Sequence, residues 1–295
     1  MGSVHARALA RAAPDVELAA VVEPSDVAVA RLAVSAPRFR ETSELVAWGG
    51  VDGAIVAVPT RLHRAVVSEL LDAGVPVLCE KPCGLTSEDT AALAWRARAF
   101  GLPLHIGYWR RFVPGLRELQ ARIAVGGLGE IELVFCAQWD ERPPPASFRD
   151  PASSGGILVD MGVHEFDQLR WLTGQEVVEV TGVTCSVSSE PPVEGDPEAV
   201  GLAVRLADGA TGLVSLVRRH PPGDVCRVEV VGTRAVARLE FLAPPDGDET
   251  LLAALCAQAR DFAAAIGGAA SAGASADDAA QALAVAERAR LALGL

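Results

Sequence analysis

The residues of this chain that could do chemistry fall into a few sets, and the first surrounds its single lysine. Of the 26 basic residues, Lys81 is the only lysine and the other 25 are arginines. It lies in the stretch Val77-Leu78-Cys79-Glu80-Lys81-Pro82-Cys83, directly after an apolar run. Lys has a compact ammonium whose pKa responds to burial, whereas Arg stays charged. At the end of a strand, Lys81 can face a cofactor or a substrate hydroxyl; the alternative is a solvated surface lysine.

The second set lies in the stretch Gly155-Gly156-Ile157-Leu158-Val159-Asp160-Met161-Gly162-Val163-His164. We expect Asp160 to cap the helix that follows, which would bring its carboxylate near His164, one helical turn on. A His beside a carboxylate is a plausible proton acceptor near neutral pH. The alternatives are a plain capping Asp and a packed helical His. The zinc motif His-Glu-x-x-His is absent because its last position is Gln168, so we expect no metal.

Two further stretches place polar side chains after apolar runs. Pro59, Thr60 and His63 follow one run, and the carboxyl ends of parallel strands are where open α/β sheets bind ligands. Arg110 and Arg111 follow another run, where they could reach substrate oxygens; an interdomain salt bridge is an equal alternative for Arg111.

The elements that must position these residues alternate in type over the first part of the chain. Short apolar runs bounded by turn residues predict buried strands, and longer periodic runs with polar starts predict helices. Strand, helix and strand at this spacing predict a parallel, doubly wound Rossmann sheet over a domain of residues 1–112. The predicted strands are 16–22, 51–58, 75–79 and 103–107, and the predicted helices are 3–13, 26–34, 42–48, 62–73 and 86–100.

From about residue 127 strands follow one another directly. Turns at Asp208-Gly209 and Gly232-Thr233 predict hairpins, hence an α+β domain over residues 113–295 with a mainly antiparallel, open sheet. An exposed face of this sheet would favour contacts in a homo-dimer or homo-tetramer. The predicted strands are 129–139, 176–188, 199–207, 210–219, 224–232 and 235–242, and the helices are 161–173, 250–266 and 277–293.

The expected opening strand of the first domain is absent from this sequence. A dinucleotide-binding unit begins with a strand and Gly-x-Gly-x-x-Gly before its first helix, and an acidic residue follows about 20 positions later. Here Gly2 sits at the third glycine and Glu23 supplies the acid, but the first strand and two glycines are missing. We therefore expect the functional protein to begin upstream of Met1, which would be an internal methionine.

Composition excludes several partners. The net charge is −12 and the pI is near 4.9, without a basic patch, so nucleic acid and anionic membranes are not expected to bind. No apolar run approaches the roughly 20 residues of a membrane span. The six cysteines are scattered and form no Cys-x-x-Cys pair, which fits reduced thiols in the cytoplasm.

Taken together, these stretches resemble the Gfo/Idh/MocA oxidoreductases, the family of glucose–fructose oxidoreductase and inositol dehydrogenase. The resemblance rests on Glu80-Lys81-Pro82 followed about 80 residues later by Asp160-x-Gly162-x-His164-x-x-Asp167, and it covers nearly the whole chain. Its Arg-Arg-Phe and Gly-Gly-Ile stretches look most like the inositol dehydrogenase branch.

The resemblance implies NAD(P)-dependent hydride transfer to or from a sugar or cyclic polyol. Lys81, Asp160 and His164 match the catalytic set, and Arg110 would be a further substrate contact. The cofactor would meet residues of the first domain, where the acidic Glu23 favours NAD over NADP. These cofactor residues are Gly2, Glu23, Pro59, Thr60, His63, Glu80 and Lys81. The alternative is a non-catalytic ligand-binding or regulatory member of the same fold.

Overall fold

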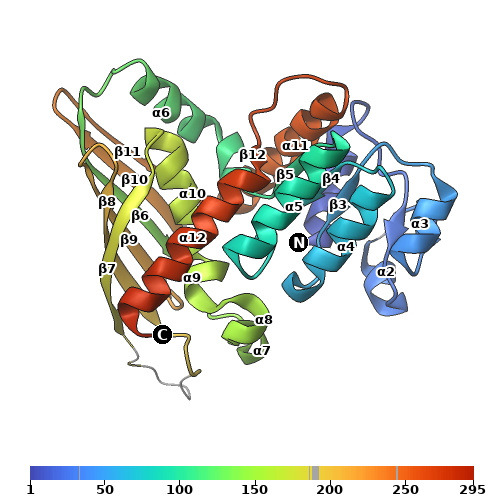
Figure 1. The fold of residues 1–295 in the computed structure, drawn as a ribbon, viewed down its shortest axis with the longest axis horizontal. Helices are drawn as coiled ribbons and strands as arrows, with labels where there is room; N and C mark the ends of the chain where they lie inside the picture. The colour runs from blue at the N-terminus through green and yellow to red at the C-terminus, as the bar shows by residue number, and fades with distance from the viewer. Residues whose placement is uncertain (33, 186, 188–192, 244) are drawn as a thin grey trace. The chain divides into compact units, whose positions relative to one another are not determined.

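The computed structural model describes every residue except 33, 186, 188–192 and 244 (Figure 1). The described residues form two compact units, and neither is one continuous stretch. Unit 1 comprises Met1–Gly84, Glu88–Phe112 and Leu252–Asp277, and unit 2 comprises Leu85–Ser87, Val113–Leu251 and Asp278–Leu295. Unit 1 therefore takes in a segment from near the end of the chain.

Unit 1 is built on short parallel strands with helices between them. Strands β3 (Ala54–Val56), β4 (Val77–Cys79) and β5 (Leu104–Ile106) are parallel, and β12 (Ala274–Ser275) adds to β5 in the antiparallel sense. A separate parallel pair joins β1 (Val21–Val22) to β2 (Arg38–Phe39). The helices are α1 (Gly2–Ala12), α2 (Asp26–Leu32), α3 (Thr42–Trp48), α4 (Thr60–Asp72), α5 (Ser87–Phe100), the 3-10 helix η1 (Trp109–Phe112) and α11 (Gly247–Ile266).

These parallel strands are shorter than the apolar runs that predict them. The sequence predicts a strand over 16–22, but β1 contains only its last two residues. Its partner β2 is itself two residues long, which limits the ladder. Among the described residues no ladder joins β1 to β3, the two strands between which a further strand is expected. Strands β2 and β12 are too short to leave a periodic signal in the sequence.

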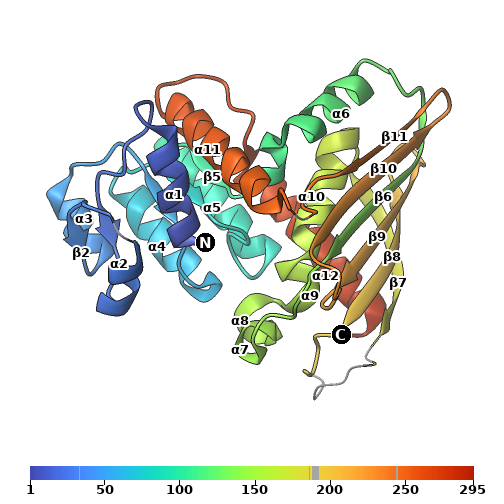
Figure 2. The ribbon, with the colours of Figure 1, turned by 180° about the vertical axis from the view of Figure 1, so that it is seen from behind.

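The core of unit 1 lies around β4. All three of its residues are buried, as expected for a parallel strand covered on both faces. Helix α11, which comes late in the chain, lies beside α1 (Figure 2). Its Arg260 donates to the Asp15 carboxylate and to the Ala12 carbonyl. Asp261 on the same helix accepts from Ser271, Ala272 and Gly273, which ties down the small-residue loop before β12.

Unit 2 is built on a six-stranded sheet with the order β11-β10-β6-β9-β8-β7. Its neighbouring strands are antiparallel except for the parallel pair β6 and β9. The strands are β6 (Ile131–Trp139), β7 (Val177–Cys185), β8 (Ala199–Leu206), β9 (Thr211–Val217), β10 (Val225–Gly232) and β11 (Val236–Glu240). The helices are α6 (Pro114–Ala124), α7 (Ala146–Arg149), α8 (Pro151–Ser154), α9 (Gly156–Asp160), α10 (Gly162–Thr173) and α12 (Ala276–Leu293).

One face of this sheet is covered and the other is open. Along β8, buried and exposed residues alternate strictly after the first position. Helix α10 packs on the covered face, where a Cβ added to Gly212 would lie 2.6 Å from the Leu169 side chain. The opposite face carries exposed side chains, among them Val183 and Leu213. The period-2 pattern of these strands is what the sequence shows most clearly.

Candidate functional site

In unit 1, three chain segments meet at the carboxyl ends of the parallel strands. The Glu80 amide donates to the Val56 carbonyl at 2.8 Å, and the Gly107 amide donates to the Cys79 carbonyl at 2.7 Å. The segments after β3, β4 and β5 are therefore held side by side by their main chains. This edge is where an open α/β sheet binds its ligand, and Lys81 lies on it, partly exposed.

Glu80 is turned inward rather than toward solvent. Its Oε1 lies 2.6 Å from Nε2 of His5 on α1, and its Oε2 accepts from the Lys81 amide at 3.2 Å. A Cβ added to Gly107 would lie 3.1 Å from Glu80 atoms, so the close approach depends on glycine there. Glu80 thus anchors α1 to the turn that carries Lys81, and its predicted contact with the cofactor stays a prediction.

His63 is also a buried connector. Its Nδ1 lies 2.7 Å from the Pro82 carbonyl and its Nε2 lies 2.8 Å from the Val58 carbonyl. Both ring nitrogens are used to join the segment after β3 to the segment after β4. Pro59 and Thr60, at the start of α4, are less covered than His63 and remain the candidates to face a cofactor.

The two thiols that flank Lys81 are packing groups. Cys79 and Cys83 are both buried. Burial raises the pKa of the Cys79 thiol well above its usual 9.0, and the adjacent Cys83 and Glu80 raise it further. The Cys79 thiol therefore stays protonated at neutral pH and is no nucleophile.

Two of the residues predicted to meet the adenosine end of a dinucleotide lie at the start of α1 and after β1. Gly2 opens α1 and is exposed, with no acidic side chain in the first turn to repel a phosphate. A Cβ there would lie 4.0 Å from the Ala57 Cβ, which is ordinary van der Waals contact, so this spacing does not itself require glycine. Glu23 follows β1, and its Oε1 accepts from the Ser25 amide at 2.8 Å.

Two arginines near Glu23 were not anticipated from the sequence. Arg38 donates to the Glu23 carbonyl at 2.9 Å, and both Arg38 and Arg40 bond to the Asp26 carboxylate. These hydrogen bonds lower the pKa of Asp26, with Arg38 the largest cause. An Arg at this position can accommodate the 2′-phosphate of NADP. Here the carboxylate of Asp26 engages both arginines.

In unit 2, Asp160 and His164 lie on consecutive helices. Asp160 is the last residue of α9, and His164 is buried in the first turn of α10. The prediction that Asp160 caps the second helix is wrong, because the N-cap position is Met161. An additional short helix, α9, ends at Asp160. The Asp160 carboxylate instead accepts from the Arg218 guanidinium, Nη1 to Oδ2 at 2.8 Å.

The partner of Asp160 belongs to a buried ion-pair network. Arg218 also donates from Nη2 to Oδ1 of Asp196 at 2.9 Å. Arg149 donates from Nε to Oδ2 of Asp196 at 2.6 Å and from Nη2 to Oε1 of Glu198 at 2.7 Å. We call Arg149, Asp160, Asp196, Glu198 and Arg218 the unit 2 network. Sequence reasoning missed four of its members, because they lie far apart along the chain and share no motif.

A further carboxyl lies beside this network. Asp140 follows β6, and burial raises its pKa above the usual 3.8. The carboxylates of Asp160 and Asp224 raise the pKa further, whereas the Gln138 amide and Arg218 oppose the shift. Among the described residues, no group of three His, Cys, Asp or Glu side chains is arranged to hold a metal ion.

Arg110 lies in η1 and is buried, as is Arg111. Lys81 and Arg110 belong to unit 1, whereas Asp160 and His164 belong to unit 2. In unit 1 the structure joins Glu80, Lys81 and His63, the last through the Pro82 carbonyl. In unit 2 it joins Asp160 to Arg218. The catalytic and substrate-binding roles of these residues stay predictions.

Comparison with known proteins decides the family. Residues 1–108 match the model of an oxidoreductase family with an NAD-binding Rossmann fold, and residues 116–238 match the GFO/IDH/MocA C-terminal domain. The chain belongs to the Gfo/Idh/MocA oxidoreductase family. This confirms the predicted Rossmann domain followed by a domain with a mainly antiparallel sheet, and it confirms NAD as the expected cofactor.

Individual relatives cover most of the chain. The chain is 47% identical over 290 residues to the rhizopine catabolism protein MocA of Rhizobium meliloti, covering 98% of this chain and 90% of that protein. It is 36% identical over 236 residues to the myo-inositol dehydrogenase Hyg17 of Streptomyces leeuwenhoekii, covering 79% and 72%. The crystal structure of GenD2 from gentamicin A biosynthesis, in complex with NAD, superposes with a TM-score of 0.90 at 25% identity, covering 100% and 91%.

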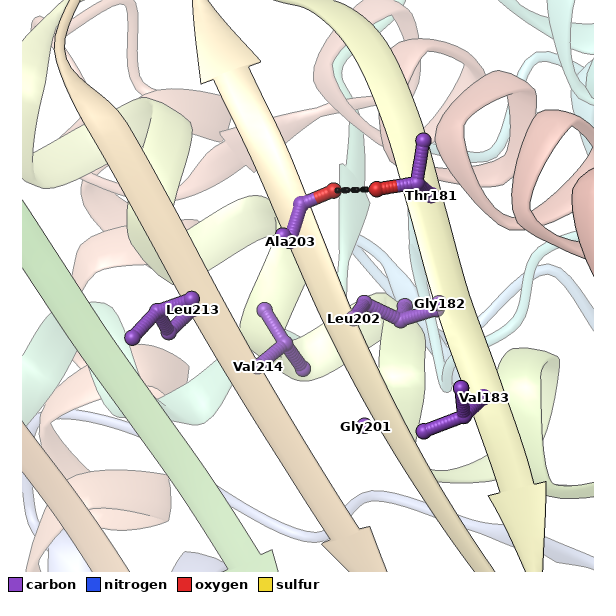
Figure 3. Close-up of a pocket in the computed structure, with 8 residues that line it drawn as sticks. All are labelled: Thr181, Gly182, Val183, Gly201, Leu202, Ala203, Leu213 and Val214. Atoms are coloured by element: carbon purple, nitrogen blue, oxygen red, sulfur yellow. Dashed lines mark hydrogen bonds between the residues drawn. The ribbon is translucent and has the colours of Figure 1, made fainter.

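Two other features bear on assembly and environment. The open face of unit 2 has a shallow groove of about 500 Å³ across β7, β8 and β9, and Figure 3 shows Val183, Leu202 and Leu213 along it. At one end Thr181 donates from its hydroxyl to the Ala203 carbonyl at 3.5 Å.

None of the helices formed by the described residues has the length and apolar character needed to cross a membrane.

Proposed function

We propose that this protein is an NAD-dependent dehydrogenase that oxidises a ring hydroxyl of an inositol-like cyclic polyol or sugar, or reduces the corresponding ketone. The observation that carries the proposal is the partly exposed Asp160 carboxylate, which Arg218 holds by a hydrogen bond. Asp160 ends α9, the helix directly before the one that contains His164. A fixed carboxylate and a histidine four residues on provide a base and a group to orient it. The likeness to a myo-inositol dehydrogenase supports the substrate class.

His164 is the general base of this proposal. It takes the proton of the reacting hydroxyl at a ring nitrogen, while Asp160 orients the substrate and stabilises the imidazolium. Lys81 hydrogen-bonds the reacting oxygen and stabilises its developing negative charge. Arg110 binds a further substrate oxygen. Bound NAD supplies the hydride acceptor.

The cofactor is held by unit 1 in this proposal. Gly2 and the start of α1 meet the pyrophosphate, since a helix N-terminus favours anions. Glu23 binds the ribose hydroxyls, and its negative charge together with the engagement of Arg38 and Arg40 by Asp26 favours NAD over NADP. The remaining cofactor contacts come from the strand-end segments, namely Pro59, Thr60, His63, Glu80 and Lys81.

The test is an assay of nicotinamide absorbance with myo-inositol, scyllo-inositol and a panel of sugars. We expect turnover by the wild-type chain with NAD, and a loss of about 100-fold or more in kcat for Lys81→Met and for His164→Ala, as removal of a general base or oxyanion donor typically causes. Arg98→Gln, which removes an exposed ion pair with Asp277, is the control and should retain full turnover.

The alternative, a non-catalytic ligand-binding member of the fold, is not favoured by the comparisons. Calorimetric titration with NAD separates the two. Tight NAD binding with no turnover on the whole panel would overturn the dehydrogenase proposal, as would full turnover by both Lys81→Met and His164→Ala.

We further propose that the protein works in the cytoplasm as a homo-dimer or homo-tetramer, joined through the open face of the unit 2 sheet. The groove across β7, β8 and β9 and the exposed Val183 and Leu213 support this face. Light scattering of Val183→Asp and Leu213→Asp tests it. Both should shift the wild-type oligomer to monomer, whereas an unchanged mass would exclude this face.

A further inference from the structure

A fully buried arginine stands behind the Asp160 carboxylate. Arg218 directly follows β9, and its side chain has 0% exposure, whereas Asp160 keeps 17%. A guanidinium that is removed from water needs carboxylate partners, because an unpaired buried charge is strongly destabilising. Arg218 finds two, and they lie on different segments: Asp160 at the end of α9 and Asp196 in the loop before β8.

The second of these carboxylates also holds the helix that carries the first. Oδ1 of Asp196 accepts from the Ile157 amide at 2.6 Å, and Ile157 lies in α9. Arg149 in turn fixes Asp196, through its Oδ2 and through its main-chain carbonyl at 2.9 Å. The Ile157 amide near the start of α9 and the Asp160 carboxylate at its end are therefore both held by the unit 2 network. This arrangement fixes both the position and the rotamer of Asp160.

We propose that Arg218 is a positioning residue for the proposed dehydrogenase reaction. Its planar fork sets the direction of the Asp160 carboxylate, so that the carboxylate meets His164 and the substrate in one orientation. The inference rests on the proposed function of Asp160. A lysine in its place keeps the charge but lacks the planar fork that presents a separate nitrogen to each carboxylate, so it does not fix both in the same geometry.

The rival interpretation is an ion pair that serves folding alone. Stability measurements do not separate the two, since either predicts that loss of Arg218 destabilises unit 2. Kinetics do separate them. An arginine that acts through Asp160 changes kcat and its pH dependence, and its effect disappears once the carboxylate is gone. The titratable and charged groups around the site that enter this pH dependence are Asp140, Asp160, His164, Asp196, Arg218 and Asp224.

The experiment compares Arg218→Met, Arg218→Lys, Asp160→Asn and the double variant Arg218→Met/Asp160→Asn, assayed with NAD and both inositols between pH 6 and 10. We expect Arg218→Met to lower kcat about 100-fold, the loss that misplacement of a reacting group by 1 Å can cause. The acid limb of the profile should move to higher pH, because the carboxylates lose a cation. The KM for NAD should stay within twofold. Arg218→Lys should return the acid limb toward its wild-type position, because it restores the positive charge, but it should restore little of kcat.

The control is Arg170→Met, which removes a buried arginine of the same unit whose Nε and Nη2 are bonded to Glu176, outside the unit 2 network. It should lose stability and keep kcat and the pH profile. In the Asp160→Asn background, Arg218→Met should cost less than threefold.

Two results would overturn the inference. One is that Arg218→Met has the same kcat and pH profile as Arg170→Met. The other is that Arg218→Met lowers kcat by the same factor in the wild type and in the Asp160→Asn background. If Arg218→Met does not fold, Arg218→Lys decides by the same criteria for kcat. Absence of turnover in the wild type overturns the proposed function and this inference together. Turnover that is lost in Asp160→Asn and kept in the Arg218 variants overturns only the role of Arg218.

Discussion

The two units fix their candidate functional residues by different means. In unit 1 the turn that carries Lys81 is held by main-chain hydrogen bonds between strand ends, by the pair of His5 and Glu80, and by His63 on the Pro82 carbonyl. In unit 2 the Asp160 carboxylate is held by the unit 2 network, whose members come from α7, α9, the loop before β8 and the residue after β9. The first device follows from strand order, whereas the second depends on side chains distant in sequence.

Burial makes this difference matter energetically. Unit 1 also has a cluster of two arginines on one aspartate, Arg38 and Arg40 on Asp26, but that cluster is largely exposed. Exposed ion pairs contribute little because water and salt screen them. The corresponding group in unit 2, Arg149 and Arg218 on Asp196, is buried, so loss of one member leaves charges that water cannot reach.

The largest effect is therefore expected for Asp196→Asn. This change leaves two buried guanidinium groups short of a partner and should cost about 3–5 kcal/mol of the free energy of unfolding. Urea unfolding followed by circular dichroism measures it. The matched control is Asp26→Asn, which also faces two arginines and should shift the unfolding midpoint far less. Equal shifts for the two variants would refute the role that burial has in this comparison.

A smaller loss is expected in unit 1 when His5 is removed. His5→Ala removes the partner of Oε1 of the buried Glu80 carboxylate, whereas Oε2 keeps the Lys81 amide, and an unsatisfied buried group costs about 1–3 kcal/mol. His5→Gln can still donate a hydrogen bond and should recover part of the loss. Thermal unfolding of the two variants checks this order, and an equal loss in both would show that the imidazole packs without serving Glu80.

The sequence predicted unit 1 more completely than it predicted the network of unit 2. Alternating apolar runs indicated the parallel strands, so Lys81 could be assigned to a strand end before any coordinates were known. Hairpin turns and period-2 alternation likewise indicated the antiparallel sheet. Helix α9 was missed, because five residues without a capping side chain leave no periodic signal, and the assignment of Asp160 as a cap failed with it. Arg218 and Asp196 could not be paired, since no local pattern joins them.

A tight main-chain contact in unit 1 gives the third prediction. In Gly107→Ala the new Cβ would lie 3.1 Å from Glu80 atoms, so the Glu80 segment must shift by a few tenths of an ångström. We expect a loss of about 1–2 kcal/mol, typical of overpacking, together with reduced kcat through Lys81. Gly201→Ala on the open face of β8 is the control, since its new Cβ would meet only Val183 at 3.8 Å. Retained stability and kcat in Gly107→Ala would show that Glu80 tolerates the displacement.

The smallest effects are expected from one titrating group in each unit, and their signs are opposite. In unit 1, burial lowers the pKa of His105 below its usual 6.5, although Asp261 opposes the shift. Its contribution to stability is present above pH 6.5 and is lost as the pH falls through the lowered value. In unit 2 the pKa of Asp140 is raised above 3.8, so its contribution is present below that pH and is lost as the pH rises through the raised value.

His105→Gln should therefore lose less of its free energy of unfolding than the wild type does when the pH falls from 7 to 5. Asp140→Asn should have a higher free energy of unfolding than the wild type at pH 7, and no such gain below pH 3.8. Each change should be smaller than the losses expected for Asp196→Asn and His5→Ala. Thermal midpoints from pH 3.5 to 8 measure both. We expect the stability gained over the wild type to grow as the pH falls in His105→Gln and to grow as the pH rises in Asp140→Asn. The same pH trend in both variants would mean that the units do not differ in this respect, whereas opposite trends would extend the contrast between them from ion pairs to single buried groups.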